Sequence, residues 1–223
     1  MKTTLRNFLF LGALACASGA TPAYAVRPTV ITSLPFNITV PGTYVLNNNL
    51  TLAPLVSVYA ILITCSDVMV DLNGYTITGP GGATQKSFGI EAVNVNNVIG
   101  AISNIILKNG TITNFEIGIL SFPTNGLAGY GATDCVIKNI TMSVINGEAI
   151  LDNDGKGNHI EHCVIVPDPN LTIGIELSNC TDDLVSENEF HPLPVFLPAP
   201  YQDIIVEGTV EGNEVVKNKD VTP

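Results

Sequence analysis

The chain has 223 residues, of which 13% are charged and 46% are apolar, and its formal net charge at pH 7 is -11. This length suits one well-buried domain. The acidity excludes a generic nucleic-acid-binding protein, which needs a basic face, and argues against non-specific binding to anionic membranes or acidic polymers. Val, Ile, Thr and Asn are abundant and Trp is absent, which is typical of a β protein with Asn-rich and Gly-rich turns.

Residues 1–25 have the features of a signal peptide. Lys2 and Arg6 supply a positive start, residues 8–17 are apolar, and Ala23-Tyr24-Ala25 fits a small-x-small cleavage site. The apolar run is shorter than the roughly 20 residues that a membrane span needs. We therefore expect cleavage after Ala25, export to the periplasm or the cell exterior, and no membrane span.

Residues 26–58 read as an N-terminal lead-in region. Short β runs are expected at 38–40, 44–46 and 50–52, with turns at Pro41-Gly42 and at residues 47–49. Regular repeats are expected from Ala60 onwards.

A six-residue phrase recurs in the rest of the chain: an apolar residue, four mostly polar or small residues, and a second apolar residue. The copies begin at Leu72, Leu107, Ile137, Ile160, Val185 and Ile205. A second apolar column is expected at Ile90, Ile119, Ile150 and Ile175. Asn109, Asn139 and Asn188 are expected to stack in turns. Self-similarity on this scale indicates a solenoid in which each copy is one rung.

The expected fold is all-β: a right-handed parallel β-helix of about six or seven rungs, forming a single domain over residues 26–223. Stacked rungs bury apolar ladders that one rung cannot bury alone. No helical pattern separates the copies, which excludes a doubly wound α/β fold, and a β-sandwich is the alternative fold. A Pro-rich segment, 192–202, is expected to form a C-terminal capping segment that shields the open end of the coil.

The segments Val70-Asp71-Leu72-Asn73-Gly74-Tyr75-Thr76-Ile77-Thr78-Gly79, Phe88-Gly89-Ile90 and Ile106-Leu107-Lys108-Asn109-Gly110-Thr111-Ile112 resemble exported bacterial right-handed parallel β-helix repeat proteins of the pectin-lyase-like superfamily. The resemblance covers roughly residues 30–215. It implies the fold but not the function, because that superfamily includes lyases, hydrolases, adhesins and unassigned proteins.

Four acidic residues on the C-terminal rungs are the candidate catalytic groups: Glu161, Asp182, Asp183 and Glu187. Glycoside hydrolysis needs two carboxylates that face one bond at a fixed separation from each other. Glu161 and Glu187, on adjacent rungs, would stand close to that separation. The competing interpretation is a solvated acidic turn surface. Of the segments that the resemblance implies for polygalacturonase-like hydrolases, only Asp182-Asp183 is present. The cations that a uronate lyase would need are scarce.

Metal and disulfide chemistry give weaker signals. Asp152-Asn153-Asp154-Gly155 resembles the middle of a calcium loop, with Asp152 and Asp154 as candidate Ca²⁺ ligands. The closing acidic ligand is missing, and a plain polar turn is the alternative; no other cofactor is expected. Export permits disulfides among Cys65, Cys135, Cys163 and Cys180. These four residues equally fit a role as small apolar groups stacked in the core.

The sequence therefore favours an exported, non-catalytic β-helix protein that acts as a binding or structural module at or outside the cell envelope. A polysaccharide or an envelope surface partner is the expected ligand, with Tyr75, Tyr130 and Tyr201 as possible stacking surfaces. The alternative is a small polysaccharide hydrolase, or less favourably a lyase, that uses the acidic residues above. The oligomeric state is left open.

Overall fold

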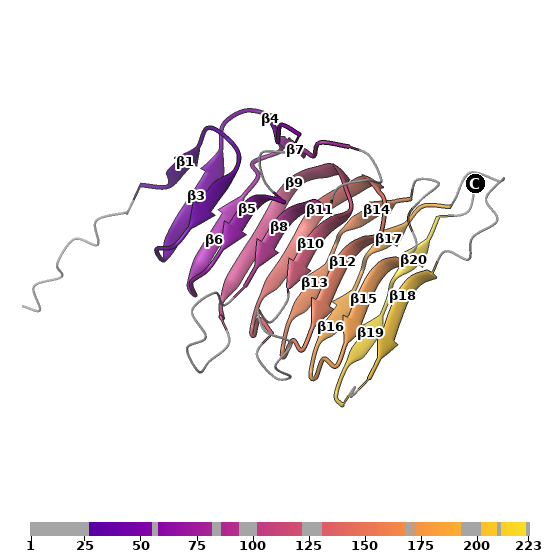
Figure 1. Ribbon diagram of the computed structural model, residues 1–223. Coiled ribbons are helices and arrows are strands. Elements are labelled where there is room, and N and C mark those ends of the chain that lie inside the picture. The colour runs from indigo at the N-terminus through magenta and orange to yellow at the C-terminus, as the bar shows by residue number, and fades with distance from the viewer. Residues whose placement is uncertain are drawn as a thin grey trace, which may run out of the picture.

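In the computed structural model, residues 27–54, 58–81, 86–93, 102–121, 131–167, 171, 173–192, 202–208 and 211–221 are described. Within these residues the chain forms β-strands that pair in parallel and stack as a coil from the indigo N-terminal end to the yellow C-terminal end (Figure 1). The expected all-β parallel solenoid is confirmed. Among the described residues no helix is long and apolar enough to cross a membrane.

The coil has three sides. The first side carries, in spatial order, β1 (Thr29–Ile31), β3 (Gly42–Leu46), β6 (Val68–Asp71), β9 (Ile105–Phe115), β11 (Val136–Ile145), β13 (His159–Glu161), β16 (Leu184–Ser186) and β19 (Glu214–Val216). The second side carries β4 (Leu50–Thr51), β7 (Thr76–Thr78), the later halves of β9 and β11, β14 (Val164–Val166), β17 (Glu189–Phe190) and β20 (Lys219–Asp220).

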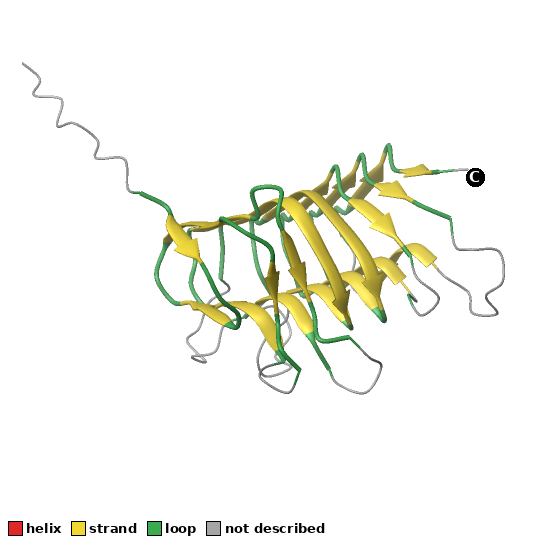
Figure 2. Ribbon diagram, turned by 90° about the horizontal axis from the view of Figure 1, so that it is seen from above, coloured by secondary structure: helices red, strands yellow, loops and turns green. Residues whose placement is uncertain are grey.

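The third side is a seven-stranded sheet that faces the other two across the interior (Figure 2). Its strands are β2 (Phe36–Ile38), β5 (Tyr59–Ile63), β8 (Phe88–Ala92), β10 (Ile117–Ser121), β12 (Glu148–Asn153), β15 (Ile173–Ser178) and β18 (Gln202–Glu207). The lead-in strand expected at 38–40 therefore ends at Ile38, and Val40 is 62% exposed.

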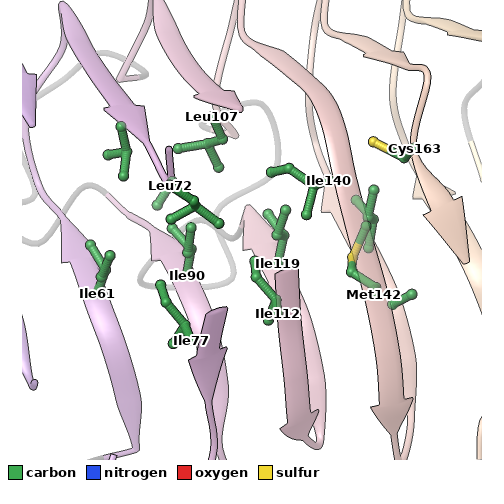
Figure 3. Close-up of a cluster of buried hydrophobic side chains, with 14 of the residues drawn as sticks. Ile61, Leu72, Ile77, Ile90, Leu107, Ile112, Ile119, Ile140, Met142 and Cys163 are labelled. Carbon is green, nitrogen blue, oxygen red and sulfur yellow. The ribbon is translucent and has the colours of Figure 1, made fainter. Parts of the chain in front are cut away.

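The core consists of aliphatic columns that run along the coil axis. Ile61, Ile90, Ile119, Ile150 and Ile175 occupy one register position on successive strands of the third side. This confirms the second apolar column expected from the sequence. Figure 3 shows the first three of these residues together with Leu72, Leu107, Ile112, Ile140 and Met142, and the side chains meet in a common interior.

The predicted alignment of the first apolar ladder is confirmed for its middle members and is wrong for the members at its two ends. Leu107, Ile137, Ile160 and Val185 are aligned, as expected. Val70 instead of Leu72 pairs with Leu107, because the turn in that rung holds two more residues. Ile205 pairs with Glu176 on the third side, and the ladder continues to Val215. A short apolar–polar–apolar spacing occurs on every side of the coil, so spacing alone cannot assign a copy to a side.

Left-handed backbone at two bends turns each rung. One bend carries Asp67, Asn104, Asp134, Gly157, Asp182 and Gly212, and the next bend carries Asn109, Asn139, His162, Glu187 and Lys217, all with φ between 53° and 76°. Asn, Asp and Gly tolerate this conformation best. Asn109 and Asn139 do stack, but Asn188 lies one position further on and inside the coil.

Several expectations fall on residues outside the described ranges. These are the signal peptide at residues 1–25, most of the capping segment at 192–202, and the side chains of Tyr130 and Tyr201. The division into a signal peptide and one domain therefore stays a prediction. Among the described residues, the cysteines at positions 65, 135, 163 and 180 are free thiols.

Candidate functional site

Surface carboxylates form ion pairs along the first side of the coil. Asp71, Lys108, Lys138 and Glu161 are consecutive members of one outward column. Lys108 Nζ lies 3.3 Å from Asp71 Oδ2, and Lys138 Nζ lies 3.7 Å from Glu161 Oε1. Glu161, a catalytic candidate, is thus the end member of a charge ladder in which two lysines stand between two carboxylates.

The other exposed catalytic candidates are also paired. Glu187 Oε2 lies 2.7 Å from His162 Nε2, and Glu187 Oε1 lies 3.4 Å from Lys217 Nζ. Asp182 Oδ2 lies 3.8 Å from Lys156 Nζ. Glu187 shares its column with His162, whereas Glu161 is aligned with Ser186. The two glutamates therefore belong to different columns and contact different cations.

Asp183, the fourth catalytic candidate, lies inside the coil and is 2% exposed. It is the middle member of a ladder of interior side chains, with Asn158 and Asn213 on the neighbouring rungs. Each of the three directly follows the bend residue of its rung, which is Gly157, Asp182 or Gly212. Asn158 N–H donates to Asp183 Oδ1 at 2.7 Å, and Asp183 N–H donates to Asn213 Oδ1 at 2.9 Å. The four candidates are thus divided between the interior and the surface.

Asp183 differs from its two ladder neighbours in the second polar atom of the side chain, which is Oδ2 in Asp183 and Nδ2 in the two asparagines. Asn158 Nδ2 donates to Ala132 O at 2.9 Å, and Asn213 Nδ2 donates to Cys180 O at 2.9 Å. Asp183 has Oδ2 in place of that amide, and Oδ2 is buried without a hydrogen-bond partner. A buried polar atom that lacks a partner is costly.

Asp152, the first calcium-loop candidate, is also interior. It lies on β12 in the inward column of Ala92, Ser121 and Leu177, and it is 3% exposed. Asn158 Nδ2 donates to its Oδ2 at 2.8 Å, while its Oδ1 is buried without a partner. Burial, followed by the charge of Asp183, raises the pKa of Asp152 above its ordinary value, and the nearby amide of Asn158 and hydroxyl of Ser121 oppose that shift.

Cys180 completes a compact group with the two aspartates. One carboxylate oxygen from Asp152, one from Asp183 and the Cys180 sulfur all lie within 4.8 Å of one another. The Cys180 thiol donates to Asp152 O at 3.3 Å. Burial raises the pKa of this thiol, and burial also raises the pKa of Asp183, with the Asn158 N–H and the nearby Cys180 thiol acting in the opposite direction.

Local packing fixes this acidic centre, which we define as Asp152, Cys180 and Asp183. Gly155 lies against it, and a Cβ at Gly155 would stand 2.5 Å from Asp152 Oδ1 and 2.5 Å from Asn158 Nδ2. A cavity of about 30 Å³ adjoins Asp152 and Asn158 and is otherwise walled mainly by aliphatic side chains. Asp154, the second calcium-loop candidate, has left-handed backbone in the following turn and is not a member of the centre.

The alternation of side chains along the strands already indicates part of this centre. Asp152 stands two residues after Ile150, and Asp183 stands two residues before Val185; both of those residues belong to predicted inward columns. Side chains two apart on a strand share a face. Alternation alone therefore predicts inward carboxylates, whereas the calcium-loop and hydrolase motifs place both aspartates in turns.

A second feature is a hydroxyl face on the second side of the coil. Thr76, Thr111 and Thr141 are aligned in one column on β7, β9 and β11. A parallel column two residues further along contains Thr51, Thr78, Thr113 and Ser143. All seven side chains are at least partly exposed, and Ser143 Oγ donates to Thr113 Oγ1 at 3.2 Å.

Comparisons with family models, with curated proteins and with solved structures found no match to this chain. The class that the structure itself defines is a parallel β-solenoid, and it carries a buried acidic centre and an outward hydroxyl face.

Proposed function

We propose that the chain is an exported, non-catalytic β-helix protein that binds a neutral polysaccharide at the cell envelope or outside the cell. The observation that carries this proposal is the hydroxyl face: Thr51, Thr76, Thr78, Thr111, Thr113, Thr141 and Ser143. Export and the resemblance to pectin-lyase-like β-helix proteins are the sequence-based part of the same proposal.

The geometry of the face suits an extended ligand. Neighbouring strands lie about 4.8 Å apart, and side chains two residues apart on one strand are separated by about 6.6 Å. The hydroxyls therefore form a regular grid on a rigid sheet. Each hydroxyl is one donor and a two-fold acceptor, which matches the alternating donors and acceptors of sugar hydroxyls.

The charge of the molecule favours a neutral ligand. The seven residues of the hydroxyl face carry no charge, and the whole chain has a formal net charge of -11. A polyuronate would be repelled by that net charge, whereas an uncharged sugar would not. Tyr75 precedes the face, but its side chain packs partly against the core, so the contacts that we propose at this face are hydrogen bonds.

The arrangement of the acidic residues supports a binding role over hydrolysis. Glu161, Asp182 and Glu187 each lie beside a surface cation, and Asp183 is enclosed in the coil. Retaining and inverting hydrolases require two carboxylates open to the same glycosidic bond. The buried position of Asp183 removes the only Asp-Asp pair from such a role.

The test is calorimetry with purified protein, residues 26–223, against soluble neutral polysaccharides (a β-glucan, a xylan and a galactomannan) and against polygalacturonate. We expect saturable binding to at least one neutral polymer and none to polygalacturonate. The double variant Thr111→Val, Thr141→Val keeps the β-branched shape but removes two hydroxyls. It should weaken binding by about 30-fold, because two hydrogen bonds of about 1 kcal/mol each are lost.

Thr43→Val is the matched control, because Thr43 lies on β3 of the first side with similar partial exposure. This control should bind as tightly as the unmodified chain. The absence of measurable binding to every neutral polymer would refute the proposal, and so would undiminished binding by the double variant.

A further inference from the structure

We infer that the acidic centre of Asp152, Cys180 and Asp183 is a binding site for a divalent transition-metal cation of the zinc type, enclosed within the coil. Three groups able to ligate a metal converge there within 4.8 Å of one another, and all three residues are buried. This inference is independent of the hydroxyl face and of the proposed sugar binding.

The two unpartnered oxygens point to a cation. Asp152 Oδ1 and Asp183 Oδ2 are both buried and have no hydrogen-bond partner, although their sister oxygens accept from Asn158. Buried carboxylates require a partner or a metal. The residue types strengthen the point, because the equivalent positions of the neighbouring rungs carry Asn158 and Asn213, which satisfy the same ladder without a charge.

The donor set selects the kind of metal. A thiolate with two carboxylates suits Zn²⁺, which takes sulfur at about 2.3 Å and carboxylate oxygen at about 2.0–2.2 Å in a four-coordinate site. Calcium prefers six to eight oxygen ligands and has no affinity for the sulfur. Small side-chain rotations would bring the three ligand atoms around one ion. The cavity that Asp152 and Asn158 line has room for a water on the Asp152 side of the centre.

The ion would also offset most of the charge of the centre. Two carboxylates and one thiolate carry three negative charges, and the two positive charges of the ion leave a net charge of only -1. On binding, the Cys180 sulfur forms the metal bond and its proton leaves to solvent. Because the centre forms from two successive rungs, with Asp152 on one and Cys180 and Asp183 around the next, the ion would link those rungs and stabilise the folded chain.

The test uses residues 26–223, purified under reducing conditions, freed of metal by chelation and titrated with Zn²⁺. We expect one Zn²⁺ per chain and a rise in melting temperature on loading. Asp183→Asn is the decisive variant, because it completes the Asn ladder and should fold well. It should melt higher than the unmodified chain without metal, and its Zn²⁺ affinity should fall by at least about 100-fold, since even partners outside the ligand set contribute 10–100-fold.

Cys180→Ala tests the thiolate. With Co²⁺ as the probe, the unmodified chain should show a sulfur-to-metal charge-transfer absorption that Cys180→Ala lacks. Cys163→Ala is the matched control, because Cys163 is equally buried but is not a member of the centre; it should keep both the absorption and the Zn²⁺ affinity.

Three outcomes would overturn the inference. The first is the absence of stoichiometric Zn²⁺ binding by the unmodified chain. The second is equal affinity in Asp183→Asn, which would place the ion elsewhere, for example at the exposed His159 and His162. The third is evidence that Cys180 is not a ligand. This would be a Co²⁺ spectrum without a sulfur band, or Ca²⁺ binding in preference to Zn²⁺.

Discussion

At the residue scale, an amide and a carboxylate at equivalent positions inside this coil differ in the hydrogen bonds that they can form. Asn158, Asp183 and Asn213 all accept the same kind of main-chain N–H bond through Oδ1. Only the amides can also donate to a carbonyl. A buried Asp in such a ladder is therefore tolerated only with a proton or a cation beside it, because a lone buried charge is strongly unfavourable.

Glu91 is a residue-scale case on the outer surface. It lies on β8 between Leu62 and Leu120 of the neighbouring strands, and burial raises its pKa. The folded chain therefore holds this proton more tightly than the unfolded chain does. Glu91 destabilises the fold once it ionises, so stability falls as pH rises from about 4 through the raised folded pKa.

We predict that Glu91→Gln raises the free energy of unfolding at pH 7. This gain should disappear below about pH 4, where Glu91 is neutral in both the folded and the unfolded chain. Urea denaturation at the two pH values measures the effect. Glu214→Gln, at an exposed position, controls for the reduced net charge and should change stability much less. An equal gain at both pH values would contradict the assigned cause.

At the element scale, alternation on short strands sets which side chains enter the coil. On β13, Ile160 is 1% exposed, whereas its neighbours His159 and Glu161 face outward. The same alternation on β12 places Ile150 and Asp152 together inside. The sequence predicted the aliphatic members of these columns but not the polar ones, because polar residues were assigned to the surface by type instead of by register.

We predict that Ile160→Ala costs about 2–4 kcal/mol of stability, because it leaves a cavity in a stacked ladder that cannot collapse easily. Lys138→Ala should change stability by less than about 0.5 kcal/mol, because its ion pair with Glu161 is partly exposed. Chemical denaturation of both variants measures the difference. Similar losses for the two would show that the inward and outward assignment is mistaken.

At the scale of the whole molecule, each rung contacts mainly the rungs before and after it. The register runs continuously from β1 to β19 along the first side and from β2 to β18 along the third side. Stability in such a stack is close to a sum of rung and interface contributions. Among the described residues, the C-terminal strands β18, β19 and β20 contain no buried side chain, and Val215 is 44% exposed and Val206 36% exposed.

We predict that removing residues 211–223 leaves a folded but less stable coil. The deletion removes β19, β20 and the side chains of Asn213 and Asn218, which accept the N–H groups of Asp183 and Asn188. Far-UV circular dichroism should keep its β signal, and the melting temperature should fall. Complete loss of the β signal would show that the last rung is required for folding instead of only extending the stack.

The sequence by itself determined the all-β class, the coil, the aliphatic columns through Ile90 and Ile137, and the bends at Asn109 and Asn139, because these depend on local spacing and on backbone preference. Only the tertiary structure decided which residues align across rungs of unequal length, such as Val70 with Leu107 and Val215 with Val185. Turn lengths shift the register, and spacing within one copy does not record that shift. For the same reason Asp152, Cys180 and Asp183, separated along the chain, become neighbours only when rungs stack.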